Sequence, residues 1–152
     1  MKSILTLLGL MVFFAGHVNA DDGLISIKSK YSVDETLDRL ESVVKGKGLT
    51  VFARIDHTAG ANKVDKELRP TKLLVFGNPK VGTLMMQSNQ TAGIDLPMKA
   101  LAWEDGTGQV WLTYNSAKYI ANRHHITDRE ETVQKMTGAL RKFTSHAAGL
   151  QE

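Results

Sequence analysis

Apolar residues recur along this chain at two spacings, one typical of strands and one typical of helices. Five segments either alternate between apolar and polar residues or form one short apolar run, and both patterns predict β-strands. These segments are residues 24–30, 49–57, 71–76, 98–104 and 109–114. The segment 71–76 is a continuous apolar run, which predicts a fully buried strand.

Two segments carry an apolar stripe at helical spacing. The first stripe, spaced four, three and four, consists of Val33, Leu37, Leu40 and Val44. The second, spaced three, four, three and four, consists of Val133, Met136, Leu140, Phe143 and Ala147. Each stripe follows a Ser or Thr with a Glu three residues later, which are the pairs Ser32 with Glu35 and Thr127 with Glu130. This pattern is that of a capping box, so we expect an amphipathic helix after each pair.

The connections between these elements are short and contain turn residues. Residues 105–108 read Asp-Gly-Thr-Gly, which predicts a hairpin turn between the last two strands. Residues 80–89, with Pro79 at the first helical position, and residues 115–122 predict two short helices. The polar segment 58–70 predicts a loop with one helical turn.

The order of the elements predicts the fold class. With the short helices set aside, the order is β-α-β-β-β-β-α. Because the strands are grouped and linked by hairpins, we expect an antiparallel sheet with two main helices on one face, an α+β fold. The sequence contains no internal repeat, low-complexity tract or linker, so residues 21–152 are predicted to form a single domain.

The first residues have the pattern of a secretory signal peptide. Lys2 precedes an apolar run at 4–15, and Val18-Asn19-Ala20 places small residues where a signal peptidase cleaves. The run is too short to span a bilayer. We therefore expect residues 1–20 to be removed and residues 21–152 to be exported to a bacterial periplasm.

Composition narrows the classes of function. The chain has 19 basic and 16 acidic residues, and the basic ones are scattered, so neither their number nor their pattern predicts nucleic-acid binding. It has no cysteine, which excludes thiol chemistry, iron–sulfur clusters, thiolate zinc sites and haem attachment through C-x-x-C-H. No second apolar run is long enough to span a membrane, so we expect no stable membrane insertion.

Several motifs in the second half of the chain resemble one bacterial family. They are FGNPKVGT at 76–83, Asp95-Leu96-Pro97, Trp103-Glu104-Asp105, VWLTYN at 110–115, and Arg123-His124. In combination these blocks resemble the domain of unknown function 302 family, although Leu84 stands where we expect a proline. The resemblance implies a small fold similar to the TATA-binding-protein-like arrangement, and it makes a homodimer an expectation. It implies no activity.

A glycine-rich turn and an aromatic hairpin are the candidate ligand site. Asn78 and Lys80 lie where a buried strand enters a short helix, a position whose free N–H groups attract anions. Trp111 and Tyr114 belong to the hairpin, whose aromatic residues form either an apolar patch or part of the core. We expect a non-enzymatic module that binds a small apolar or anionic ligand near these four residues and acts as a homodimer. The competing interpretation of the turn is a rigid structural connection.

Three other functions stay open at this point. His124 and Met86 could bind copper or ligate haem, although no ligand spacing supports this and no cofactor is specified. An enzyme with an unrecognised site would bring Asp95, Glu104 and His124 together in a polar cleft. No catalytic residue can be named from local motifs. If the protein has an assembly role, the hairpin that carries the two tryptophans would form the contact between the two copies of a dimer.

Overall fold

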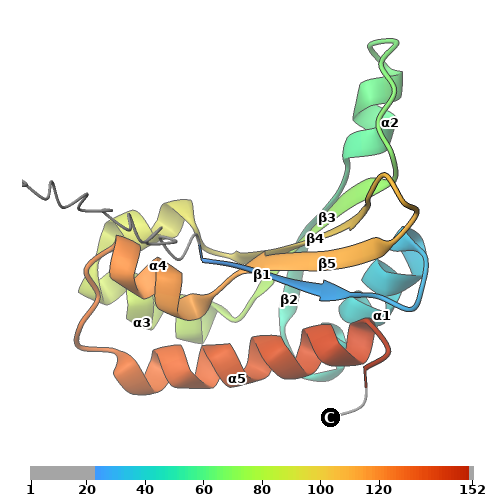
Figure 1. The fold of residues 1–152 in the computed structure, drawn as a ribbon. Helices are drawn as coiled ribbons and strands as arrows, with labels where there is room; N and C mark the ends of the chain where they lie inside the picture. The colour runs from blue at the N-terminus through green and yellow to red at the C-terminus, as the bar shows by residue number, and fades with distance from the viewer. Residues whose placement is uncertain (1–22, 151–152) are drawn as a thin grey trace, which may run out of the picture.

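A single antiparallel sheet organises the molecule, with strand order β1-β5-β4-β3-β2 (Figure 1). The computed structural model describes residues 23–150, and the predicted signal peptide at 1–20 lies outside the described residues. The strands are β1 (Leu24–Lys28), β2 (Thr50–Asp56), β3 (Thr71–Gly77), β4 (Met98–Glu104) and β5 (Val110–Asn115). All five predicted strands are therefore present, and the predicted α+β class is confirmed.

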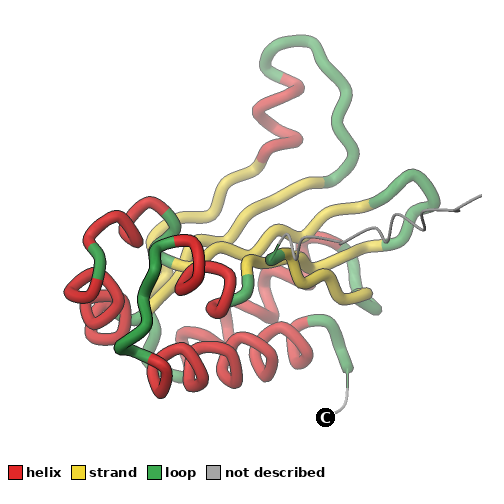
Figure 2. Tube along the Cα trace, turned by 60° about the vertical axis from the view of Figure 1, so that its left-hand side comes forward, coloured by secondary structure: helices red, strands yellow, loops and turns green. Residues whose placement is uncertain are grey.

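Two long helices lie on one face of this sheet, most of the shorter helices gather at one end, and one short helix projects beyond the other end (Figures 1 and 2). The helices are α1 (Val33–Gly46), α2 (His57–Asn62), α3 (Pro79–Ser88), the 3-10 helix η1 (Gln90–Ile94), α4 (Ala117–Arg123) and α5 (Glu130–Ala147). Helix α1 packs against β2 to β5, and α5 packs alongside α1. Among the described residues, no helix covers the middle of the opposite face (Figure 2). We call this the open face and define it by Ile55, Leu73, Leu101, Trp103 and Trp111.

Helix α1 begins and ends as its sequence predicts. The Ser32 hydroxyl accepts a hydrogen bond from the backbone N–H of Glu35 at 3.2 Å, which satisfies one of the free donors of the first turn. The apolar stripe Val33, Leu37, Leu40 and Val44 is buried against the sheet. After Gly46 the chain turns at Gly48, whose φ of +74° favours glycine over residues with a side chain.

Helix α5 begins differently from the prediction, and Thr127 is not its cap. The helix starts at Glu130 after Arg129, and no side chain caps it. The preceding residues are instead bound to α3, because Ser88 donates to the Asp128 carboxylate and Arg129 Nε donates to the carbonyl of Leu84 at 3.1 Å. The segment that was predicted to begin this helix therefore attaches it to α3.

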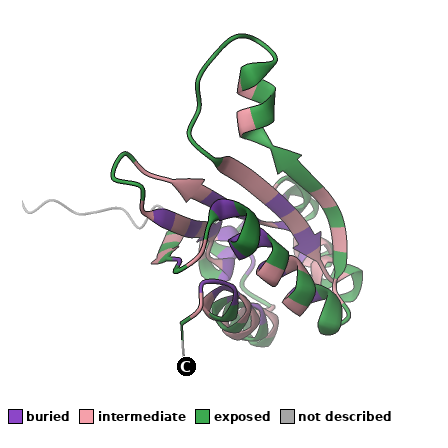
Figure 3. Ribbon diagram, turned by 90° about the vertical axis from the view of Figure 1, so that its right-hand side faces the viewer, coloured by how far each residue is buried: buried purple, intermediate pink, exposed green. Residues whose placement is uncertain are grey.

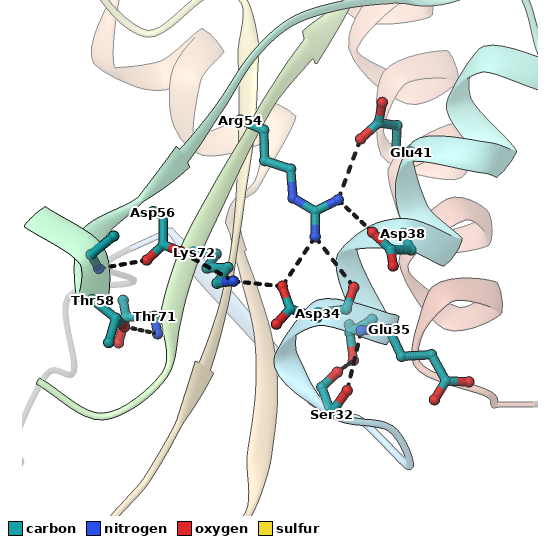
Figure 4. Close-up of polar contacts among 12 residues, drawn as sticks. Ser32, Asp34, Glu35, Asp38, Glu41, Arg54, Asp56, Thr58, Thr71 and Lys72 are labelled. Atoms are coloured by element: carbon teal, nitrogen blue, oxygen red, sulfur yellow. Dashed lines mark hydrogen bonds and ion pairs between the residues drawn. The ribbon is translucent and has the colours of Figure 1, made fainter.

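An ion-pair network connects α1 to the edge of the sheet (Figure 4). Arg54 of β2 reaches three acidic side chains of α1, which are Asp34, Asp38 and Glu41. Lys72 of β3 bridges Asp34 at 2.6 Å and Asp56 at 3.1 Å. The backbone N–H of Ala59 and then Lys72 lower the pKa of Asp56. The carboxylates of Asp34 and Asp38 are well exposed to solvent, so their ion pairs orient α1 more than they stabilise the fold.

The turn between β4 and β5 depends on one carboxylate. Asp105 Oδ1 accepts from the hydroxyl and the backbone N–H of Thr107 and from the N–H of Gln109, while Oδ2 accepts from Trp111 Nε1 at 2.8 Å. These bonds, that of the Thr107 hydroxyl first, hold the pKa of Asp105 far below its ordinary value. Trp103 and Trp111 are cross-strand partners whose ring centroids lie 6.4 Å apart, as the hairpin predicted.

We expect Asp105→Asn to lower the melting temperature at pH 7, because an amide cannot accept the same set of hydrogen bonds. A carboxylate with a lowered pKa contributes stability that is present above its unfolded-state pKa of about 4 and is lost as the pH falls toward the folded-state value. The difference in melting temperature between the native protein and the variant should therefore become smaller below about pH 4. Thermal melts across this range check it, with Asp65→Asn, an exposed residue of the segment after α2, as the control. An equal deficit at every pH would contradict the role of the charge.

Candidate functional site

A pocket of about 440 Å³ opens between α3, α5 and the adjoining end of the sheet. Most of its lining is apolar and includes Phe52, Phe76, Val81, Met86, Met136 and Phe143. The polar side chains that line it are Asn78, Thr83 and Lys135. Because Thr83 and Lys135 are exposed to solvent, they lie toward the mouth of the pocket. The interior is therefore suited to an apolar group.

A β-bulge in β2 turns Phe52 toward this pocket. Val51 is paired with Phe76 and Ala53 with Val75, so Phe52 is an extra residue without a partner in β3. Bulges commonly re-aim a side chain beside a functional site. The Phe52 side chain is 51% exposed while it lines the pocket, which places it at the opening.

The glycine-rich turn forms one wall of the pocket. Asn78 caps α3, since its Oδ1 accepts from the backbone N–H of Lys80 at 3.0 Å, and Pro79 occupies the first turn as predicted. A side chain at Gly77 would bring its Cβ to 3.4 Å from the Cβ of Pro97, so the two segments pack closely here. The turn is thus both a rigid connection and a pocket wall.

A polar network fixes the adjoining part of the pocket wall, which includes Leu96 and Pro97. His124 is buried, and its Nε2 lies 2.7 Å from Asp95 Oδ2 while its Nδ1 lies 2.8 Å from the Thr91 hydroxyl. The amide of Asn89 donates to the His124 carbonyl at 2.8 Å. Buried polar groups are costly when unpaired, so this network ties α4 to the segment 89–97.

The four residues predicted to bind a ligand do not form one site. Asn78 lines the pocket, and Lys80 is exposed two residues further along α3. Tyr114 is buried on the face that the helices cover, at 5% exposure. Trp111 lies on the open face, because its neighbour Leu112 is in the core and successive strand residues point to opposite faces. Only Asn78 of the four lines the pocket.

The two residues predicted as metal ligands have separate surroundings. Met86 lines the pocket, and its sulfur is 3.3 Å from where a Cβ on Gly93 would stand. Both ring nitrogens of His124 are already hydrogen-bonded, to Thr91 and Asp95. Within residues 23–150, no three His, Asp or Glu side chains are grouped so that they could hold a metal ion.

The predicted acid–base set is brought together only in part. Asp95 and His124 are hydrogen-bonded, and Arg123 Nη1 lies 3.3 Å from Asp95 Oδ1. Glu104 is at the far end of β4, since Asp95 precedes the first residue of this strand and Glu104 is the last. The pair is therefore a local network beside the pocket rather than a cleft with three catalytic groups.

Sequence reasoning missed most of the pocket-lining residues and part of the network. Met136 and Phe143 belong to the predicted apolar stripe of α5, which was interpreted as core, and the half-buried state of Phe143 is visible only in three dimensions. The bulge that turns Phe52 cannot be recognised from the alternation of apolar and polar residues in this segment. Asn89 and Thr91 follow a predicted helix in a polar stretch, where no pattern distinguishes them.

Known proteins resemble this chain over most of its length. It is 44% identical over 130 residues to a protein of Brucella suis biovar 1 (strain 1330) named fluoride-specific ion channel FluC 1, with 85% of this chain and 51% of that protein covered. A protein of the same name from Brucella abortus biovar 1 (strain 9-941) is also 44% identical over 130 residues, with 48% of its length covered. The chain thus spans about half the length of the curated relatives it matches. No helix in the described part of this chain is long and apolar enough to cross a membrane.

A solved structure and a family model complete the comparison. The crystal structure of an uncharacterized conserved DUF302 protein from Bacillus stearothermophilus has a TM-score of 0.67 at 16% identity, and covers 84% of this chain and 97% of that one. At this identity the likeness shows the shared fold. The model of the family described as domain of unknown function DUF302 matches residues 25–143, and the chain belongs to this family.

Proposed function

We propose that this protein is an exported, non-enzymatic module that binds a small apolar molecule in the pocket and acts as a homodimer. The observation that carries the proposal is the pocket of about 440 Å³ between α3, α5 and the sheet. Pockets of about 300–1,000 Å³ with apolar linings and a few polar groups are typical of small-molecule sites.

The side chains of the pocket favour a ligand without a buried charge. Phe52, Met86, Met136 and Phe143 provide aromatic and polarisable surface, and methionine adapts its shape to different ligands. Asn78 already accepts a backbone hydrogen bond, and Lys135 pairs with Glu131 at 2.6 Å in solvent. A ligand would therefore place its apolar part inside and any polar group at the mouth.

The polar network supports a non-enzymatic role. The His124 ring is hydrogen-bonded to both Thr91 and Asp95, and none of the three lines the pocket. Their bonds hold the segment that carries Leu96 and Pro97, so the network positions a wall. The proposal of an exported protein rests on the signal-peptide pattern at 1–20 and on the absence of cysteine.

Filling the pocket should abolish binding. We expect the neutral fluorescent probe N-phenyl-1-naphthylamine to bind residues 21–152, and Ala139→Phe to weaken this binding about tenfold or more by occupying the cavity. The matched control is Gln134→Phe, which adds the same ring at an exposed position of α5. Circular dichroism verifies that both variants are folded. Failure of the native protein to bind, or equal binding by both variants, would overturn the pocket as the site.

The relatives favour a second candidate function. They carry the name of a fluoride-specific ion channel, and this chain matches only about half of their length. Two units that are joined in one chain are present in equal numbers and at the same location in the cell. We infer on this basis that the residues of this chain serve a fluoride channel as an accessory unit.

Deleting the gene tests this second candidate. We expect the deletion strain to tolerate several-fold less fluoride than its parent, while its tolerance of the same concentrations of chloride is unchanged. Supplying residues 1–152 in trans should restore tolerance. Unchanged fluoride tolerance in the deletion strain would remove the second candidate and leave the pocket proposal intact.

A further inference from the structure

The open face of the sheet is unusual because its central residues are apolar. Across the strands, Ile55, Leu73 and Leu101 form one row, and Trp103 and Trp111 form the next. On the other face of β3, β4 and β5, residues such as Leu74, Ala100 and Leu112 are buried under the helices. An antiparallel sheet with one face in water normally carries polar residues on that face.

The charged side chains near the open face do not make its centre polar. Lys99 is turned toward the loop before β4, where its Nζ donates to the carbonyls of Asp95 and Pro97. Lys28 lies over the Trp111 ring at 5.5 Å. The strand β3 thus carries apolar residues on both faces, which matches its sequence pattern of a fully buried strand although helices cover only one face.

A second exposed feature projects from the same sheet, and it carries two apolar side chains among several charged ones. Residues 57–70, which connect β2 to β3 and include α2, extend beyond the strand ends (Figures 1 and 3), and we call them the arm. Helix α2 buries no residue, and Val64 and Leu68 are 64% and 43% exposed. The base of the arm is held in place, because the Thr58 hydroxyl accepts from the backbone N–H of Thr71 at 2.9 Å.

We propose that the open face and the arm are two parts of one interface, and that its occupant is a second copy of this chain. The four strands that carry the open face, spaced about 4.8 Å apart over about five residues, present roughly 300 Å², whereas a stable dimer buries about 800 Å² per partner. The sheet face alone is too small, and the arm supplies additional area. In a two-fold dimer the arm of each copy lies on the open face of the other, so both apolar features are covered at once.

This inference rests on the homodimer of the proposed function and is independent of the pocket. Phe52 and the other pocket residues are not part of the interface. A native protein that binds the probe but stays monomeric would contradict this inference and leave the pocket as the ligand site, whereas a dimer that does not bind the probe would contradict only the ligand proposal.

The first test is sedimentation of residues 21–152. We expect a concentration-dependent dimer whose dissociation constant rises about tenfold or more in Val64→Glu/Leu68→Glu, because each new carboxylate would be desolvated in the interface. Both positions are exposed, so the monomer fold is spared. The matched control is Ile94→Glu, another exposed apolar residue, 73% exposed on η1, which should dimerise normally. A protein that stays monomeric, or a dimer that the double variant leaves intact, would overturn the proposal.

Cross-linking then identifies the surface. Because the chain has no cysteine, Val64→Cys places a single benzophenone label on the arm. In a mixture of isotopically light and heavy protein, we expect cross-links from the arm to β3, β4 and β5 of the other copy. Cross-links confined to the same copy, or to the helices of the other copy, would show that the arm does not cover the open face.

Discussion

The packing of α1 and α5 against one face of a single sheet is the constraint on which the rest of the structure depends. Leu37, Leu40 and Val44 of α1 are fully buried, and β4 faces this helix with Ala100 and Ala102, whose small side chains allow close approach. Burying one leucine contributes about 1.5–3 kcal/mol, whereas a solvated ion pair such as those of Arg54 contributes about 0–1 kcal/mol. Apolar packing therefore holds α1 in place, and the ion pairs select its orientation.

The pocket follows from the unequal lengths of the two helices. Helix α5 has 18 residues and α1 has 14, and α5 also packs against α3 and α4 at the end of the sheet. Its last turn buries Thr144 and Ala147 in the core, while Met136 and Ala139 in its middle line the pocket. The attachment of Arg129 to α3 sets this arrangement, since it fixes where α5 begins. A ligand site thus forms where helix-on-sheet packing ends.

Local patterns predicted the fold because each strand and helix depends on near neighbours in the sequence. The alternation in β4 and β5, the stripe of α1 and the carboxylate of Asp105 act within a few residues. The site depends on contacts between distant segments, such as His124 with Thr91 and Phe143 with the end of the sheet, and no single-sequence spacing encodes them. Thr127 is an example in which a local pattern predicted the wrong structure. The residues that follow it, Asp128 and Arg129, bind α3 instead, so Thr127 does not cap α5.

Strands β2 and β3 connect the pocket to the open face. Phe52 of β2 turns into the pocket through the bulge, Ile55 of the same strand lies on the open face, and the arm follows directly after Asp56. On β3, Phe76 lines the pocket while Leu73 belongs to the open face. The bulge at Phe52 interrupts the pairing of β2 with β3 between these two features. The same two strands therefore supply side chains to the pocket and to the open face, and the bulge separates the two sites along β2.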